Sequence, residues 1–504
     1  MTRELIAAVD LGSNSFRLQI GRIVNDQIYP LDGIKQPVRL AAGLSPDRRL
    51  DDEAQERALI ALQRFGERLS GFTPDAVRAV ATNTLRVAKN ASQFLVRAER
   101  ALGFPIEVIA GREEARLIYV GVAHNLPDPH KQQLIVDIGG GSTEFIIGRS
   151  FEPLMLESLY MGCVAFSLRY FPNGQIDKRA LKEAEIAARR ELQLIAHPYR
   201  EIGWEEAVGS SGSAKALYEI LQQNGLADGA ITLDGLERLR GVMLKAGSLD
   251  KLELAGTKAD RMPVLFGGFA IMSAVFREFG LERMLFSEGA LRLGVLYDLL
   301  GRYHHHDLRD ATVLAFLERY KVDIEHAAEV ASTARMLLAE LLPRVLDAED
   351  LDGRFLDWAA RLHEIGVSIA HSSYHKHSAY IVANADMPGF SQMDQARLSR
   401  LVLAHRGKLA RVASIDPASV DWLMILSLRL AVVLHRARDG RSLPPVRLRA
   451  VEGGHELVCD DQWLAGLPLT AASLHEEQAQ WSGIGRTLQL RTEPAVLPLG
   501  NPDG

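Results

Sequence analysis

Two short loops carry the residue types that bind phosphate. The segments DLGSNS, from Asp10, and DIGGGSTE, from Asp137, each place a carboxylate at the end of an apolar run and then several small residues. Small residues let the backbone approach a ligand closely, and successive backbone N–H groups in such a turn form a concave site for phosphate oxygens. One such loop is as consistent with an ordinary hairpin turn, but two matched loops favour phosphate binding. Side-chain donors would come from Ser13, Asn14, Ser15, Ser142 and Thr143.

Three acidic residues of these loops are candidates for holding a metal ion. Asp10, Asp137 and Glu144 supply carboxylates, and Mg²⁺ is a hard cation that binds through one or two carboxylates while keeping several waters. We expect Mg²⁺ as the cofactor, with Mn²⁺ as the alternative and a monovalent cation as an additional candidate.

A third glycine-rich loop, from Val208, precedes a helical run that begins Ala214-Lys215-Ala216. The N-terminus of a helix binds anions, and Lys215 would add positive charge. A plain helix N-cap explains the same sequence equally well. The candidate phosphate-binding residues of this loop are Gly209, Ser210, Ser211, Gly212, Ser213 and Lys215.

Two adjacent glutamates open a predicted helix. A strand-like run over 106–110 is followed by GREEARLIY, which contains Glu113 and Glu114. Neighbouring side chains project about 100° apart on a helix, so at most one points into a cleft. A carboxylate there could take a proton from an attacking water, which is typically worth ~10²–10⁴-fold in rate. The spacing alone favours the simpler interpretation that both glutamates stabilise the positive end of the helix dipole.

The two phosphate loops belong to an internal repeat. The segment AVDLGSNSFRLQIGR, from Ala8, aligns without gaps to VDIGGGSTEFIIGR, from Val136, and the match pairs the aspartates, glycines, serines and final Gly-Arg. The shared order of strand, turn, small-residue loop and strand indicates duplication of one hairpin unit. We therefore expect two related halves that face each other across a cleft.

The whole chain limits the classes of protein that are possible. Its 504 residues exceed what one ordinary core contains, so three or four domains are expected. The formal net charge of -6 argues against a surface built to hold nucleic acid or an anionic membrane. Two distant cysteines, Cys163 and Cys459, suit a reducing compartment. The N-terminus predicts no signal peptide, and the longest apolar run, 422–434, predicts a buried helix rather than a membrane span.

The pattern of elements changes along the chain. The first third alternates strands near 5–9, 16–23 and 76–81 with helical patterns, which is typical of an α/β sheet. From 310 to 438 the period is helical, and the last part predicts a small α+β domain. The triplet His304-His305-His306 lies at the boundary and is interpreted as a polar hinge rather than a metal site.

Six motifs in order resemble the exopolyphosphatase and guanosine pentaphosphate phosphohydrolase family, a branch of the actin, Hsp70 and sugar-kinase fold. The motifs are VDLGSNSFRL, ATNTLRVAKN, IAGREEARLIYVGV, IVDIGGGSTEF, GSSGSAKAL and SEGALRLGVLYDLL, and the segment LHEIGVSIAHSSYHKHSAYIVANADMPGF extends the resemblance toward the long-form members. The resemblance implies an α/β fold with a duplicated actin-like core, whose lobes would span 1–125 and 126–305. A mostly helical HD-like domain, 306–440, and a small α+β domain, 441–504, would follow.

The resemblance also implies roles for particular residues. Glu114, the second glutamate of GREEA, would be the base that activates water, and Asp137 and Glu144 would bind metal and the terminal phosphates. The phosphate chain would be gripped by Ser13 to Ser15, by Thr82, Asn83, Thr84 and Arg86 of ATNTLR, and by Gly139, Gly140, Gly141, Ser142 and Thr143.

These observations predict an exopolyphosphatase that releases terminal phosphate from inorganic polyphosphate by metal-assisted attack of water. The nearest alternative is hydrolysis of guanosine pentaphosphate to the tetraphosphate. An actin-fold sugar kinase and a non-catalytic alarmone-binding regulator are the candidates from other classes. We expect a cytoplasmic homodimer, with peripheral attachment to the inner membrane face as an alternative, and no nucleic-acid partner.

The helical region departs from the His-Asp phosphohydrolase pattern. His363-Glu364 stands where that pattern has His-Asp, which argues against a catalytic metal site of that kind, and HEIGV lacks the second histidine of a zincin. A basic passage for polyphosphate is one interpretation of His371, His375, His377, His405, Lys376, Arg406 and Lys408, and ordinary surface and core positions are the other.

Overall fold

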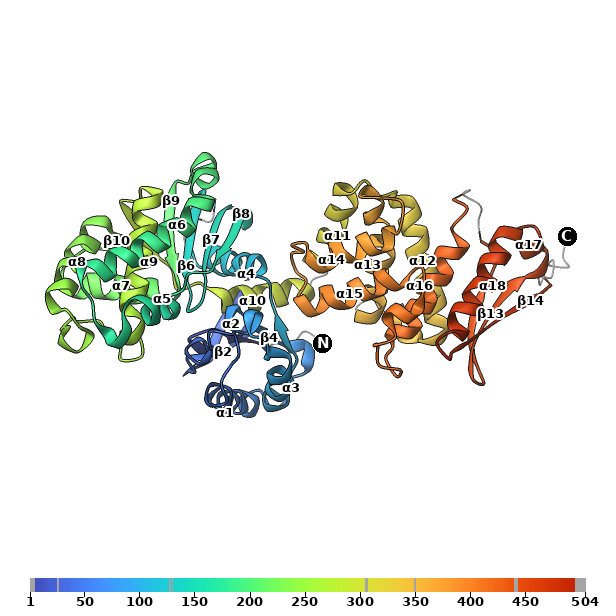
Figure 1. Ribbon diagram of the computed structural model, residues 1–504, viewed down its shortest axis with the longest axis horizontal. Coiled ribbons are helices and arrows are strands. Elements are labelled where there is room, and N and C mark those ends of the chain that lie inside the picture. The colour runs from blue at the N-terminus through green and yellow to red at the C-terminus, as the bar shows by residue number, and fades with distance from the viewer. Residues whose placement is uncertain are drawn as a thin grey trace. The chain divides into compact units, whose positions relative to one another are not determined.

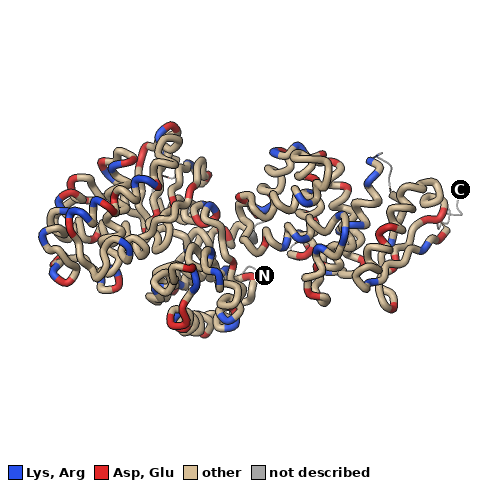
Figure 2. The backbone as a smooth tube through the Cα atoms, in the orientation of Figure 1, with Lys and Arg blue, Asp and Glu red and all other residues tan. Residues whose placement is uncertain are grey.

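The computed structural model describes residues 5–24, 27–126, 128, 130–303, 307–348, 350–438 and 443–494 (Figure 1). The chain divides into two compact units, Met1–Asp307 and Leu308–Gly504. The histidine triplet 304–306, predicted to be a hinge, lies outside the described residues. Figure 2 shows acidic and basic residues interspersed over both units, as expected for a chain with a small net charge.

The first sheet of unit 1 has five strands. Its order is β3-β2-β1-β4-β5, with antiparallel pairing among the first three strands and parallel pairing of β1, β4 and β5. The outer face of this sheet packs on the amphipathic helix α1, whose buried side chains include Ala58, Leu62 and Phe65. The helix begins after Asp51, whose side chain accepts a hydrogen bond from the Ala54 N–H. The elements are β1 (Leu5–Leu11), β2 (Ser15–Val24), β3 (Gln27–Pro37), α1 (Asp52–Arg68), β4 (Val77–Ala81), α2 (Asn83–Val87), α3 (Ala91–Leu102) and β5 (Ile106–Val108).

The second sheet of unit 1 has six strands in the order β10-β11-β9-β6-β7-β8. Its outer face is covered by helices α5 to α9 (Figure 1), whose buried side chains form one apolar cluster with those of the sheet. The elements are β6 (Gln133–Ile138), β7 (Thr143–Arg149), β8 (Glu152–Leu159), α5 (Cys163–Tyr170), α6 (Lys178–Ile202), β9 (Glu206–Ser210), α7 (Ser211–Gln223), β10 (Ile231–Thr232), α8 (Leu233–Ala246), α9 (Leu265–Phe279) and β11 (Arg283–Phe286).

The two sheets are copies of one design. The order β3-β2-β1-β4-β5 corresponds to β8-β7-β6-β9-β11, and each copy has a register shift at the same aligned position, before Gly21 in one and before Gly148 in the other. A bulge is a specific local feature, so its recurrence supports duplication more strongly than strand count alone. The predicted duplicated, two-lobed α/β core is confirmed.

Two helices pack between the lobes, α4 (Gly111–Ala123) and α10 (Leu291–Tyr303). They share one apolar cluster with residues of both sheets, including Ala8 of β1 and Ile135 of β6. A Cβ at Gly294 would lie 1.7 Å from the Leu117 carbonyl oxygen, so only glycine allows the two helices to approach this closely. The helix that carries Glu114 is therefore held firmly against both lobes.

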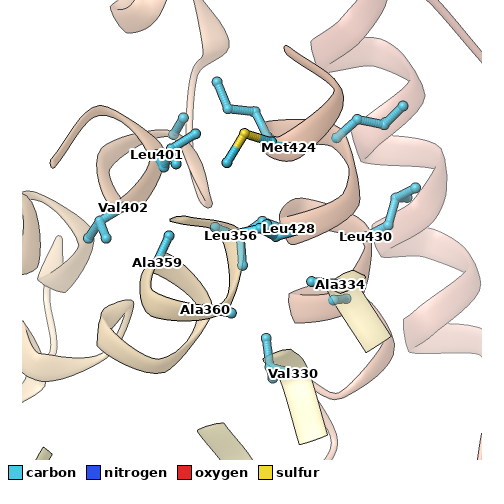
Figure 3. Close-up of a cluster of buried hydrophobic side chains, with 14 of the residues drawn as sticks. Val330, Ala334, Leu356, Ala359, Ala360, Leu401, Val402, Met424, Leu428 and Leu430 are labelled. Atoms are coloured by element: carbon cyan, nitrogen blue, oxygen red, sulfur yellow. The ribbon is translucent and has the colours of Figure 1, made fainter. Parts of the chain in front are cut away.

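Among its described residues, unit 2 combines seven longer helices and one short helix with a three-stranded sheet in the order β12-β13-β14. Its apolar residues form a single cluster, part of which is shown in Figure 3, and α16 is the buried helix predicted for the apolar run 422–434. The elements are α11 (Leu308–Arg319), α12 (Ile324–Leu341), α13 (Leu351–Leu362), α14 (Tyr374–Asn384), α15 (Gln392–Ala404), α16 (Asp421–Leu434), β12 (Arg447–Val451), β13 (Gly454–Asp460), α17 (Asp461–Ala465), α18 (Pro468–Ser482) and β14 (Thr487–Glu493).

One segment of the described chain, Met262–Phe279, is long and apolar enough to cross a membrane by length and composition. It contains α9, and 72% of the segment is buried inside the protein. Its apolar character is therefore explained by its place in the core of unit 1. Cys163 and Cys459 are both free and buried, as expected for core thiols.

Candidate functional site

A polar cleft lies in unit 1 where the duplicated loops meet. Its cavity of about 200 Å³ is lined by loop residues 12–15, 138–140 and 142, by the start of α7, and by residues 286–288 and 290–292. The sequence-predicted residues that line it are Asp10, Ser13, Asn14, Ser15, Thr82, Glu114, Asp137, Gly139, Gly140, Ser142, Ser211, Gly212 and Lys215. Most of the predicted site is thus brought together in one place.

The two phosphate loops touch each other. A Cβ at Gly140 would lie 2.9 Å from the Ser13 Cβ, and one at Gly141 would lie 2.5 Å from the Asn83 Oδ1. Glycine is therefore required at these positions by close approach and not by an unusual backbone conformation. The loops form one continuous floor for the cleft.

Carbonyl groups of both loops are held by backbone hydrogen bonds. The carbonyl of Ser13 accepts from Ala41 N–H at 2.9 Å, and that of Gly140 accepts from Val164 N–H at 3.0 Å. In a trans peptide the N–H points opposite to the C=O of the same plane. Fixing these carbonyls therefore aims the N–H groups of Asn14 and Gly141 in the opposite direction, as a phosphate-binding loop requires.

The carboxylates of the two strands are buried and close enough to influence one another. Burial raises the pKa of Asp137 to about 6, although a hydrogen bond from Ser210 opposes the shift and nearby Asp10 adds to it. Burial likewise raises the pKa of Asp10, against the attraction of Arg292 and Arg17. Glu144 lies behind the cleft wall, where burial and then the charge of Glu114 raise its pKa well above the usual value.

This donor set fits a hydrated divalent cation. Asp10 Oδ1 is buried and has no hydrogen-bond partner among the described residues, and several mutually repelling carboxylates are stabilised by a cation between them. The cleft carboxylates do not form a trio of ligand atoms within 4.8 Å. Mg²⁺ tolerates such spacing because it keeps several waters. Asp10 and Asp137, which line the cavity, would hold it, whereas Glu144, predicted as a further ligand, does not line the cavity.

Other buried polar atoms of the cleft also lack partners. They are Asn14 Oδ1, Ser15 Oγ and Asn83 Nδ2, counted over the part of the chain that the structure describes. Unpartnered buried polar groups are uncommon in native proteins and require an explanation. Their concentration beside two glycine-rich loops indicates that a polar ligand completes their hydrogen bonding.

Glu114 points into the cleft and Glu113 does not. Glu113 forms a two-bond ion pair with Arg116, at 2.8 Å for each bond, whereas Glu114 lines the cavity. Burial raises the pKa of Glu114 to about 7; Arg86 lowers it and the charges of Asp10 and Asp137 raise it further. A carboxylate poised near neutral pH is suited to general base catalysis.

Arg86 lies behind Glu114 and does not line the cavity. Its Nη1 donates to the Ile109 carbonyl at 2.8 Å and to Glu114 Oε2 at 3.2 Å. The prediction that Arg86 grips phosphate directly is thus not supported by its placement, because its hydrogen bonds are directed to the backbone and to Glu114. In this structure Arg86 positions the glutamate.

Several other predicted residues support the cleft from behind its walls. Thr84 donates to Ser13 Oγ at 2.7 Å, Thr143 donates to the Met161 carbonyl at 2.5 Å, and Ser210 donates to Asp137. The predicted phosphate-binding residues that do not line the cavity are Asn83, Thr84, Arg86, Gly141, Thr143, Gly209, Ser210 and Ser213.

Three arginines of the cleft were missed by the sequence analysis. Arg17, Arg261 and Arg292 line the cavity, and no salt bridge joins them to a carboxylate within the described ranges. Burial, with repulsion from Arg292, lowers the pKa of Arg17 to about 10. Buried like charges that repel one another are tolerated where a polyanionic ligand neutralises them. Arg17 lies just after the first phosphate loop, and Arg292 belongs to the SEGALRL motif. The positions of these two arginines in the sequence could therefore have identified them as candidate site residues.

The third glycine-rich loop forms the rim of the cleft. Ser211 and Gly212 begin α7 and line the cavity, and Ser211 donates to the Ile138 carbonyl at 3.0 Å. Lys215 pairs with Glu288 and lies 5.9 Å from the ring centre of Phe286. The rim therefore carries a fourth cationic side chain, Lys215, which is paired with Glu288.

The histidines proposed as a basic passage in the helical region separate into two groups. His375 and His405 are buried, and burial lowers the pKa of His375 to about 4. His371, Lys376, Arg406 and Lys408 are exposed, and His377 is partly exposed. The two buried histidines therefore belong to the interior and not to a surface passage.

A duplicated α/β core that encloses phosphate loops, buried carboxylates and unpaired arginines defines a phosphate-processing enzyme. The Ppx/GppA phosphatase family matches residues 19–303, and domain III of the Ppx/GppA phosphatases matches residues 308–478. A guanosine-5'-triphosphate,3'-diphosphate pyrophosphatase of Aeromonas hydrophila is 38% identical over 485 residues, which cover 95% of this chain and 97% of that protein. The chain belongs to the Ppx/GppA phosphatase family.

Solved structures agree with this assignment. An exopolyphosphatase from Cytophaga hutchinsonii is similar with a TM-score of 0.54 and 26% identity, covering 59% of this chain and 97% of its own. A Ppx/GppA family member from Aquifex aeolicus is similar with a TM-score of 0.51 and 25% identity, covering 60% and 99% of the two chains.

Proposed function

We propose that this enzyme is an exopolyphosphatase that hydrolyses the terminal phosphoanhydride bond of inorganic polyphosphate. The observation that carries the proposal is the lining of the cleft, where unpaired Arg17, Arg261 and Arg292 surround phosphate loops. Phe286 is the one aromatic residue among the described residues that line the cavity. Such a surface suits repeated phosphate groups better than it suits a nucleobase, which is usually held between apolar or aromatic side chains.

Glu114 is positioned to activate the attacking water. Its carboxylate lines the cleft, and the hydrogen bond from Arg86 fixes its orientation. Proton transfer to such a base typically contributes ~10²–10⁴-fold to the rate. Water that attacks the terminal phosphorus would lose its proton to Glu114 as the bond to the leaving phosphate breaks, so no covalent phosphoenzyme is needed.

Fixed hydrogen-bond donors would stabilise the negative charge that spreads over the phosphate oxygens in the transition state. Backbone N–H groups of the two loops and the arginines Arg17 and Arg292 surround the cavity, and preorganised donors stabilise charge that develops in the transition state. A divalent cation held by Asp10 and Asp137 would supply further neutralisation of the phosphate oxygens when bound.

A second substrate is favoured by one comparison. The relative from Aeromonas hydrophila acts, by its name, on guanosine-5'-triphosphate,3'-diphosphate, and the match extends over nearly the whole chain. The 5'-triphosphate of that nucleotide presents the same terminal bond as polyphosphate does. The second candidate function is therefore release of the 5'-terminal phosphate of guanosine pentaphosphate. Homodimer formation and a cytoplasmic location stay predictions.

The test is release of inorganic phosphate in the presence of Mg²⁺ from long-chain polyphosphate and from guanosine pentaphosphate, offered in parallel. Wild type is compared with Glu114→Gln and Glu114→Ala, and Glu113→Gln is the matched control. Glu113 is a buried glutamate one position away on the same helix that faces Arg116 instead of the cleft. Only the Glu114 variants should lose about 10²-fold or more in kcat while still binding the chain.

The outcomes separate the candidates. Preferential cleavage of polyphosphate supports the proposal, and preferential cleavage of the nucleotide replaces it with the second candidate. Equal loss in the Glu113 and Glu114 variants, measured per folded molecule, would show that the helix and not the carboxylate is responsible.

A further inference from the structure

Unit 2 contains a cluster of metal-binding groups that the cleft chemistry does not use. One ligand atom from each of His326, His363 and Glu364 lies within 4.8 Å of the others. In the part of the chain that the structure describes, this is the only trio of histidine, cysteine, aspartate or glutamate atoms that meets this spacing. The cluster lies entirely within unit 2, so it is independent of the cleft carboxylates.

Two elements of the helical bundle position the trio. His326 belongs to the first turn of α12, where its N–H donates to the capping Asp323 carboxylate at 3.1 Å. His363 and Glu364 follow the end of α13. Both histidines are buried, and only 1% of His363 is exposed. Buried imidazoles at the ends of two packed helices have little freedom to reorient.

The hydrogen bonding of His363 leaves one ring nitrogen for a ligand. Its Nδ1 lies 2.6 Å from the Ala360 carbonyl oxygen, which can only accept, so Nδ1 carries the proton. Nε2 therefore has a free lone pair, and it lies 3.8 Å from Glu364 Oε1. Metal-binding histidines are characteristically held in this way, with the second nitrogen donating to a carbonyl or a carboxylate.

Glu364 divides its two oxygens between different partners. Oε2 accepts a hydrogen bond from Arg438, whereas Oε1 faces His363. Arg438 thus fixes the carboxylate and leaves one oxygen directed at the histidines.

The chemistry of the trio selects the kind of ion. Imidazole suits Zn²⁺ and its transition-metal neighbours, whereas Mg²⁺ and Ca²⁺ prefer sites made only of oxygen. Ligands at about 2.0–2.1 Å from a tetrahedral Zn²⁺ lie roughly 3.3 Å apart, so these side chains need to draw together by about 1 Å.

We propose that His326, His363 and Glu364 form a binding site for a divalent transition-metal ion of the Zn²⁺ class. The ion joins the beginning of α12 to the end of α13. Three protein ligands leave a fourth position for water. His326 had no place in any sequence motif, since it lies 37 residues before His363 (363 minus 326) and only the fold brings the two together.

The test is metal binding by the full-length protein, stripped with chelator and titrated with Zn²⁺ and with Co²⁺. Wild type should bind one Zn²⁺ per chain in unit 2, and the Co²⁺ form should show the intense visible absorption of a tetrahedral site with imidazole ligands. Glu364→Gln and His326→Gln should each weaken binding at least about tenfold. Zn²⁺ should also raise the unfolding temperature of wild type but not of Glu364→Gln.

Two controls make the outcome specific. His405→Gln removes a neighbouring buried histidine whose ring centre lies 5.0 Å from that of His363 but which is not part of the trio, so binding should be retained. Asp137→Asn disables the cleft carboxylates, and binding should again be retained. Absence of stoichiometric Zn²⁺ binding, or binding that survives both Glu364→Gln and His326→Gln, overturns the proposal. Loss of binding in Asp137→Asn alone would assign the ion to the cleft and overturn it equally.

Discussion

Replacement of Arg86 by methionine should move the acidic limb of the pH–rate profile to higher pH. The guanidinium Nη1 lies 3.2 Å from Glu114 Oε2, and Arg86 lowers the pKa of a glutamate that burial has raised to about 7. A base must be deprotonated to act, so activity is present above its pKa and is lost as the pH falls through it. Without Arg86 the Glu114 pKa rises, and the loss of activity begins at a higher pH.

The size of the shift follows from the distance between the charges. Two unit charges 3.2 Å apart interact with about 1 kcal/mol in a water-like dielectric and about 5 kcal/mol at an effective dielectric constant of 20. A shift of one to three pKa units, roughly 1.4 to 4 kcal/mol, is the usual result for an adjacent arginine. If the limb moves from about 7 to about 8 or 9, the ionised fraction at pH 7 falls by about 5-fold or 50-fold.

The assay is kcat/KM for phosphate release from polyphosphate between pH 5.5 and about 10, because kcat/KM reports the ionisation of the free enzyme. The Arg86→Met variant should approach wild type at the alkaline end, and Arg86→Lys, which keeps the charge, should shift less. A deficit of the same size at every pH would refute the positioning role. That result would instead restore the direct phosphate contact that the sequence suggested for Arg86.

Three further predictions concern the loops, the arginines and unit 2. Gly140→Ala should reduce kcat/KM by about tenfold or more, because a methyl group would approach the Ser13 Cβ to 2.9 Å and displace the two loops. Unchanged kinetics would mean that the loops do not need to touch. Arg292→Ala should raise KM for polyphosphate about tenfold or more, since one charged hydrogen bond is worth about 1.5–3 kcal/mol, and a fall in kcat alone would argue against a binding role. Arg429 is buried and donates to both oxygens of Glu477, at 2.6 and 2.7 Å. Glu477→Gln should therefore destabilise unit 2 by about 3–5 kcal/mol in denaturant unfolding. A change in the free energy of unfolding below about 1 kcal/mol would show that the pair is dispensable.

Local patterns were sufficient to predict the elements that carry the loops. The strands around Asp10 and Asp137 and the helix that begins at Gly111 were located within a few residues, because alternation, glycine turns and helical period are properties of adjacent residues. Strand β3 (Gln27–Pro37) was missed. It is an edge strand with a largely exposed surface, so it lacks the apolar run that identifies a buried strand.

The unpredicted parts of the site depend on contacts between distant segments. Arg261 reaches the cleft from a loop between α8 and α9, and a Cβ at Gly212 would lie 1.9 Å from its Nη2. No local rule brings such a loop to a particular glycine. His405 was considered for a surface passage and is buried, because the burial of a single side chain is decided by the packing of several helices.

The duplicated hairpins differ at one informative position. Opposite Asp10 in the antiparallel register stands Arg17, and opposite Asp137, at the matching place, stands Glu144. If the two hairpins were identical, a symmetric polyanion could bind between them equally well in either direction. A single exchange of sign breaks that symmetry and gives the cleft a polarity. The proposed exopolyphosphatase activity would need such a polarity, because both ends of a polyphosphate chain are chemically the same.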